Sequence, residues 1–179
     1  TVAPASELYF VEWVDFPALT LPKLTDSEGN KKNKILFPYN EGVIIDDTDV
    51  RANMWLHHRE PEYPSEGCYS IFPNMLCSQM IAYFWDDAGL YMGAHDPKRS
   101  VKEIEFLNEN GGVSLRFRIF CGTDFGQSFT TEYPIILSVT DPKWESAAER
   151  YRRWFESELP KGIKKTVEND SLPEWYSDS

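Results

Sequence analysis

The sequence is short of the features that mark membrane and secreted proteins. Its longest apolar runs, such as Gly42–Ile45, span only a few residues, whereas a membrane-crossing helix needs about 20 apolar residues. Residues Thr1–Ser6 have neither the basic region nor the apolar region of a signal peptide. We therefore expect no membrane partner. The localisation stays open, since a secreted or periplasmic location is compatible with a leader that has been removed.

Basic residues are also scarce. The chain has 18 Lys and Arg against 29 Asp and Glu, which gives a net charge of −11. Residues 1–142 hold 11 basic and 21 acidic residues, and residues 143–179 hold 7 and 8, so the first part carries almost the whole excess. An acidic surface repels phosphate backbones and anionic lipids. The charge argues against a nucleic-acid partner and leaves neutral ligands such as sugars open.

Cysteine is rare as well. Cys68, Cys77 and Cys121 are an odd number without CxxC spacing, so at most one disulfide forms and no zinc site is indicated. Three buried thiols are the plainer interpretation, and we expect no metal and no cofactor. The 179 residues suffice for one globular domain. They fall short of the roughly 200 residues that a complete (β/α)8 barrel needs.

Most of the chain has the patterning that predicts β-strands. Residues 113–121 alternate, with apolar side chains on one face and Arg116 and Arg118 on the other. Residues 80–86 are apolar on both faces and form a predicted hairpin with residues 90–94, in which Gly89 supplies a positive φ. Further strands are predicted at Leu8–Phe16, Lys34–Phe37, Gly42–Ile45, Ser100–Asn108 and Tyr133–Val139, and Pro134 places the last of these at a sheet edge or a strand start.

One helix is predicted near the C-terminus. Apolar residues recur at three- and four-residue spacing from Trp144 to Leu159, with Asp141 as the expected N-cap and Pro142 at the first helical position. The fold class is therefore mainly β: an antiparallel β-sandwich with one C-terminal amphipathic α-helix. We divide the chain into a β-sandwich domain at 1–141, a helix at 142–160 and a tail at 161–179.

Two kinds of side chain suggest ligand binding. His95 and Asp96 follow a predicted strand, and ligand groups gather in such loops on a rigid scaffold. The structural alternative is that Asp96 caps a turn and His95 fills the rim of the core. Aromatic rings stack on the C–H faces of sugars, and Trp55 and Trp13 are the tryptophans least tied to the predicted core. The adjacent His57 and His58 are interpreted as part of a solvated loop rather than a metal site.

Several segments resemble one group of proteins. They are Phe16–Pro17, Pro38–Gly42, Ser78–Phe84, Gly89–Pro97 and Trp144–Trp154. Together they resemble bacterial glycoside-hydrolase-like proteins in which a β-supersandwich of the galactose-mutarotase type precedes a (β/α)8 barrel. The resemblance runs from about Phe16 to Trp175, and it implies that residues 142–160 are the linker helix between sandwich and barrel. The chain lacks the barrel, and fewer strands precede this region than such supersandwiches usually have.

The resemblance implies a non-catalytic accessory domain of a glycoside hydrolase. In that interpretation the chain packs on the catalytic barrel of its own polypeptide, and its aromatic residues near the C-terminus form the docking surface: Trp144, Tyr151, Trp154, Phe155 and Trp175. His95 and Asp96 would face the sugar or the barrel, and no catalytic residue is expected. Three alternatives stay open: a stand-alone carbohydrate-binding module on Trp55 or Trp13, a mutarotase-type sugar epimerase that uses His95, and an interaction domain without a ligand.

Overall fold

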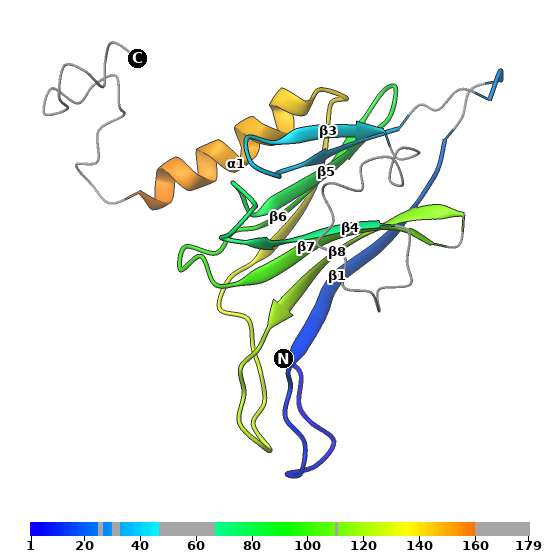
Figure 1. Ribbon diagram of the computed structural model, residues 1–179. Helices are drawn as coiled ribbons and strands as arrows, with labels where there is room; N and C mark the ends of the chain where they lie inside the picture. The colour runs from blue at the N-terminus through cyan, green and yellow to red at the C-terminus, as the bar shows by residue number, and fades with distance from the viewer. Residues whose placement is uncertain (25–26, 30–32, 47–66, 110, 160–179) are drawn as a thin grey trace, which may run out of the picture.

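The protein folds into two antiparallel β-sheets and one helix. The computed structural model describes residues 1–24, 27–29, 33–46, 67–109 and 111–159. The elements run in the order β1 (Trp13–Pro22), β2 (Lys34–Phe37), β3 (Val43–Asp46), β4 (Gly67–Phe72), β5 (Met80–Phe84), β6 (Gly89–Ala94), β7 (Lys102–Glu109), β8 (Gly112–Phe120), β9 (Ile135–Thr140) and α1 (Trp144–Glu158). Figure 1 shows the sheets as two stacked layers, with α1 on the side of the upper layer that faces away from the lower one.

The two sheets pack face to face around one core. The strand orders are β1-β8-β7-β4 and β3-β2-β5-β6-β9. The sheets bury alternate side chains against each other: Ile35, Phe37, Ile81, Tyr83 and Met92 from one sheet, and Ile104, Phe106, Leu115 and Phe117 from the other. This arrangement confirms the mainly β, antiparallel sandwich with one C-terminal helix.

A second apolar cluster explains why residues 80–84 are apolar on both faces. Ile81 and Tyr83 point into the core between the sheets, whereas the alternate residues of β5 point to the outer face. There they pack against the helix, where Ala147 is fully buried. The small side chain of Ala147 lets α1 lie close to the sheet. Strand β5 is therefore buried on both sides, and all five of its residues are inaccessible.

Two local predictions are wrong. Helix α1 begins at Trp144 rather than at residue 142, and Lys143 is its N-cap with no side-chain capping bond, so Asp141 does not cap it. Gly89 is the first residue of β6 and does not have a positive φ. Its backbone is instead closely packed, because a Cβ atom there would lie 2.6 Å from Cδ1 of Phe84 and 2.7 Å from Oγ1 of Thr140. Close approach, not turn geometry, requires glycine at this position.

The strand predictions differ from the structure mainly near the N-terminus. The first strand is Trp13–Pro22 instead of Leu8–Phe16, and β4 was not predicted. Strand β9 does lie at a sheet edge and begins just after Pro134, as predicted. The interpretation of three buried thiols is wrong for Cys77, which is exposed, and Cys121 is half-buried.

Candidate functional site

Tyr91, Gly93 and His95 lie on one side of β6 and its continuation. The Tyr91 hydroxyl lies 2.9 Å from Nε2 of His95 and forms a hydrogen bond with it. This contact requires the glycine between them, since a Cβ atom at residue 93 would lie 2.1 Å from the Tyr91 oxygen. The absent side chain thus lets the Tyr91 ring lie along the strand and position the imidazole.

Helix α1 covers the other side of His95. The imidazole stacks on the Trp154 indole with ring centroids 4.5 Å apart and planes 12° apart. Trp154 also contacts Tyr151, and the Arg99 guanidinium lies 5.0 Å from the ring centre of Phe155. Burial lowers the pKa of His95, and the nearby positive charge of Arg150 lowers it further. The His95 imidazole therefore stays neutral down to a lower pH than the imidazole of a free histidine does.

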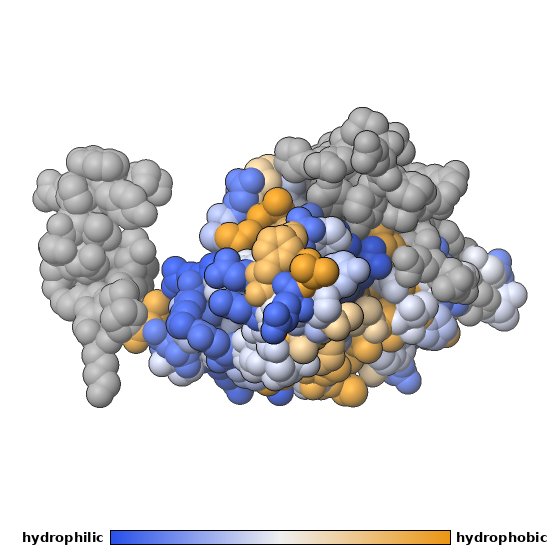
Figure 2. Space-filling model, turned by 90° about the horizontal axis from the view of Figure 1, so that it is seen from below, coloured by the Kyte–Doolittle hydropathy of each residue, from blue (hydrophilic) through white to orange (hydrophobic). Residues whose placement is uncertain are grey.

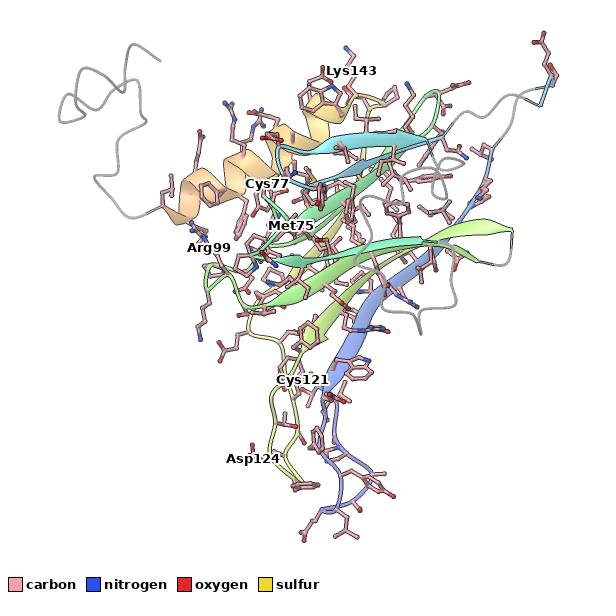
Figure 3. All side chains as sticks on the ribbon, in the orientation of Figure 1. Met75, Cys77, Arg99, Cys121, Asp124 and Lys143 are labelled. Carbon is pink, nitrogen blue, oxygen red and sulfur yellow. The ribbon has the colours of Figure 1, made fainter. Side chains whose placement is uncertain are left out.

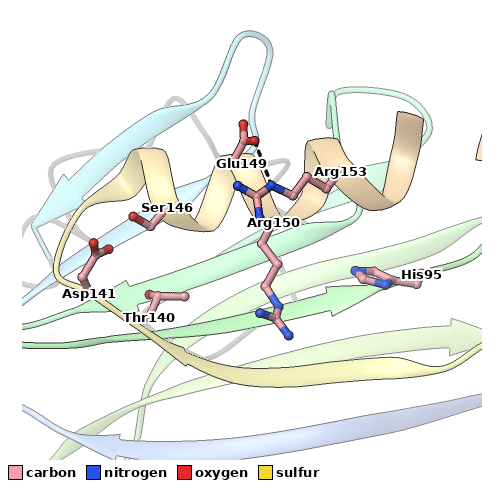
Figure 4. Close-up of a pocket in the computed structure, with 7 residues that line it drawn as sticks. All are labelled: His95, Thr140, Asp141, Ser146, Glu149, Arg150 and Arg153. Atoms are coloured by element: carbon pink, nitrogen blue, oxygen red, sulfur yellow. Dashed lines mark hydrogen bonds and ion pairs between the residues drawn. The ribbon is translucent and has the colours of Figure 1, made fainter. Parts of the chain in front are cut away.

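An open groove of about 560 Å³ lies beside this stack, between the helix and the end of β9 (Figure 4). His95, Thr140, Asp141, Ser146 and Arg150 line it, together with Glu149 and Arg153. Glu149 accepts hydrogen bonds from Arg153 at 3.0 Å and pairs with Arg152 at 2.7 Å. These two bonds lower the pKa of Glu149, which makes it a weak proton acceptor.

Asp96 is not one of the residues that line the groove, and its side chain holds a turn together. Its side chain is 1% exposed and pairs at 3.0 Å with Lys102, which is fully buried. Its two oxygen atoms also accept the backbone N–H groups of Lys98 at 2.9 Å and Ser100 at 2.7 Å. Gln79 completes the cluster, since its Oε1 accepts a bond from Lys102 at 2.6 Å and its Nε2 donates to the Asp96 carbonyl. This geometry is that of the structural alternative, in which Asp96 caps a turn.

Burial and ion pairing have opposite effects on the pKa values of Asp96 and Lys102. Burial raises the pKa of Asp96, but the bonds from Lys102 and from the Ser100 backbone outweigh burial and hold that pKa below its usual range. Burial lowers the pKa of Lys102, and Asp96 only partly opposes this effect. Both groups depend on each other for charge compensation.

The proposed sugar-platform tryptophans are only partly placed by the structure. Trp13 is 45% exposed at the start of β1. The Arg118 guanidinium covers one face of the Trp13 ring, and its central carbon lies 5.2 Å from the ring centre. Arg118 is itself fixed by Asp15 at 2.8 Å and by Glu103 at 3.3 Å. Trp55 lies outside the described residues, as do His57 and His58.

The predicted docking residues mostly have partners within the domain. Tyr151 packs with the outer apolar cluster, Trp154 stacks on His95, and Phe155 contacts Tyr151 and Arg99. Trp144 is the exception, with 46% of its surface exposed. Trp175 lies outside the described residues.

The structure reveals an apolar surface that sequence reasoning missed. Segments 1–12 and 121–130 project together from one end of the sandwich, and we call them the paired loops (Figure 1; Figure 3 labels Cys121 and Asp124 in one of them). Backbone bonds join them: Gly126 N–H to the Tyr9 carbonyl at 2.8 Å, and Cys121 N–H to the Glu12 carbonyl at 2.9 Å.

The ends of the paired loops carry large exposed apolar side chains. Leu8 is 81% exposed, Tyr9 61%, Phe10 48% and Phe125 66%. Figure 2 looks onto the end of the molecule from which these loops project, and apolar side chains reach the surface there. The apolar run Leu8–Val11 is the signal in the sequence, but its pattern predicts the start of a strand and not an exposed loop.

Comparison with known proteins adds no family. No family model, no curated protein and no solved structure matches this chain. Within the described ranges, no three His, Cys, Asp or Glu side chains are grouped so that they could hold a metal ion. The one helix that the structure describes is neither long nor apolar enough to span a bilayer. The site therefore has to be interpreted from its own geometry.

Proposed function

We propose that this chain is a non-catalytic β-sandwich domain of a carbohydrate-active protein, and that it docks on a neighbouring domain of its own polypeptide. The observation that carries the proposal is the exposed apolar end of the paired loops. Burying one Leu or Phe side chain fully is worth about 1.5–3 kcal/mol, so Leu8, Phe10 and Phe125 together offer a substantial gain to a partner. Contiguous apolar surface of this kind marks interaction sites.

The charge of the paired loops limits the kinds of partner surface that can bind them. Their only charged side chains are Glu7, Glu12 and Asp124, and they contain no Lys or Arg, so their side chains carry net negative charge. Anionic lipid is disfavoured by these carboxylates. A protein surface with an apolar pocket and basic residues at its rim is complementary.

Helix α1 supports the proposed linker role. Its C-terminal half is anchored on the sandwich by the stack of Trp154 on His95 and by Phe155 beneath Arg99. The resemblance of Gly89–Pro97 and Trp144–Trp154 to glycoside-hydrolase-like proteins supports a (β/α)8 barrel as the neighbouring domain.

The test is to produce residues 1–179 and the remainder of the encoded polypeptide separately and to measure their association by calorimetry. We expect binding that the double substitution Leu8→Ser/Phe125→Ser weakens at least tenfold. Val139→Ser is the matched control, since Val139 is 74% exposed on β9 and lies outside the paired loops. Binding that the double substitution leaves unchanged contradicts the proposal, as does a gene that encodes no further domain.

A sugar epimerase is a second candidate, because His95, Glu149 and Asp141 line the same groove. Epimerisation at the anomeric carbon needs a general base and a general acid across the ring. The lowered pKa of Glu149 makes it a poor base and favours the non-catalytic proposal. Interconversion of glucose or galactose anomers measured by NMR decides the matter, since rates equal to those in buffer remove the epimerase.

A further inference from the structure

The groove beside α1 is lined by several polar side chains with hydrogen-bonding atoms that other described residues do not use. The Arg150 guanidinium has no carboxylate partner among these residues and lies 5.8 Å from the ring centre of Tyr91. Figure 4 shows its side chain reaching into the space between His95 and Thr140. Glu149 does not neutralise it, because that carboxylate is bonded to Arg152 and Arg153. Arg150 is thus the unpaired cation of the groove.

The groups around Arg150 are suited to hydroxyls. The imidazole of His95 uses Nε2 for its bond with Tyr91, and Nδ1 has no hydrogen-bond partner in the described part of the chain. Asp141 and Ser146 line the groove at its other end, and their side chains form no bond with a described residue. One guanidinium, one imidazole, one hydroxyl side chain and one carboxylate side chain therefore line the same groove.

We propose that this groove binds a sugar acid of one or two rings, with the sugar carboxylate on Arg150 and its hydroxyls on His95, Ser146 and Asp141. A guanidinium binds a carboxylate through two parallel hydrogen bonds, which gives both affinity and orientation. The volume of about 560 Å³ lies within the usual range of small-ligand sites. The inference rests on the carbohydrate-related part of the proposed function and not on docking of the paired loops.

The charges of the side chains that line the groove allow an acidic ligand to bind although the protein as a whole is acidic. The chain carries −11 overall, which argued for neutral ligands. At the groove, however, Glu149 is offset by Arg153, and Asp141 lies at the end away from His95, beside Thr140 and Ser146 (Figure 4). A carboxylate placed on Arg150 is therefore close to an unpaired positive charge. Weak binding at low ionic strength is expected from the long-range repulsion, and salt screens that repulsion.

The experiment titrates the 179-residue chain with sodium D-glucuronate, D-glucose and propionate while backbone amide NMR signals are followed. We expect glucuronate to shift the signals of His95, Ser146 and Arg150, and to bind at least tenfold more tightly than glucose or propionate. Arg150→Gln should weaken glucuronate binding tenfold or more. Lys98→Gln is the matched control, because the exposed Lys98 pairs with Glu132 outside the groove, and it should bind as the wild type does.

Three results overturn the proposal: no shifts at the groove with glucuronate, equal binding by wild type and Arg150→Gln, or equal binding of propionate and glucuronate. Arg150→Lys keeps the charge but not the fork geometry, so it should bind more weakly than wild type and more tightly than Arg150→Gln. That variant keeps the proposal testable if Arg150→Gln does not fold. Loss of docking in Leu8→Ser/Phe125→Ser with unchanged glucuronate binding separates this site from the docking surface.

Discussion

The imidazole of His95 lies flat on the indole of Trp154, with the ring centroids 4.5 Å apart. His95 follows the last strand position of β6, and Trp154 lies in the C-terminal half of α1. The contact therefore joins the sandwich to the helix, and the hydrogen bond between Tyr91 and His95 keeps the imidazole in the stacking position. Together with the buried Ala147 and the contact of Phe155 with Arg99, it holds α1 against the sandwich.

Removing the indole should loosen the helix. We expect Trp154→Ala to lower the free energy of unfolding by about 1–3 kcal/mol, since it deletes the stack on His95 and the contact with Tyr151. Trp144→Ala is the control, because that indole is 46% exposed, and it should change stability by less than about 0.5 kcal/mol. Urea unfolding measures both. Equal losses in the two variants contradict the anchoring role of Trp154.

The pKa of His95 predicts a loss of stability in mild acid. Burial and Arg150 hold this pKa below the ordinary value of 6.5, so the unfolded chain takes up the proton before the folded chain does. The stabilising effect is complete above pH 6.5 and is lost as the pH falls toward the pKa of the folded state. His95→Gln should remove this part of the pH dependence. Urea unfolding at pH 7.5 and 5.5 tests it: an unchanged difference between the two pH values in the variant is the contrary result.

The buried pair of Asp96 and Lys102 should be sensitive to the loss of one partner. Lys102→Met leaves a carboxylate that is 1% exposed without its counter-ion, at an expected cost of about 3–5 kcal/mol. Lys102→Met/Asp96→Asn should recover much of that stability. Lys98→Met is the control, since the Lys98–Glu132 pair is exposed to solvent and its loss should change stability little. A double variant as unstable as Lys102→Met shows that the charge pair is not the cause.

Gly93 should not tolerate even one methyl group. An added Cβ atom would lie 2.1 Å from the Tyr91 hydroxyl oxygen, so Tyr91 would have to move away from His95. Gly93→Ala should cost about 1–3 kcal/mol by overpacking. It should also change the NMR signals of the His95 ring, because its hydrogen bond with Tyr91 is lost. Wild-type stability and unchanged ring signals in Gly93→Ala are incompatible with this geometry.

Alternation and two-sided patterning predicted much of the fold. The alternation in residues 113–121 predicted the outward arginines, and Arg116 and Arg118 do pair with Glu105 and Asp15 on the outer face of their sheet. Residues 80–86 are apolar on both faces, which agrees with the burial of β5 between the facing sheet and α1. These features follow from the local periodicity of apolar residues, which is visible in the sequence itself.

The site depends on contacts between distant segments, which periodicity does not record. His95 was singled out from the sequence, but its stack on Trp154 joins a strand end to a helix far along the chain. The aromatic stripe of α1 predicted a docking face for another domain, yet Tyr151 and Trp154 pack against residues of the sandwich itself. Conversely, the apolar residues at Leu8–Phe10 are exposed, because their loop projects with segment 121–130 instead of joining a sheet.

Amide hydrogen exchange at the paired loops tests the docking claim most directly. The complete encoded polypeptide and the isolated 179-residue chain are compared, with exchange followed at Leu8, Phe10 and Phe125. We predict strong protection of these amides in the complete polypeptide and fast exchange in the isolated chain, with little change at Val139, which is exposed on β9. Equally fast exchange at the paired loops in both forms would contradict a docking surface there.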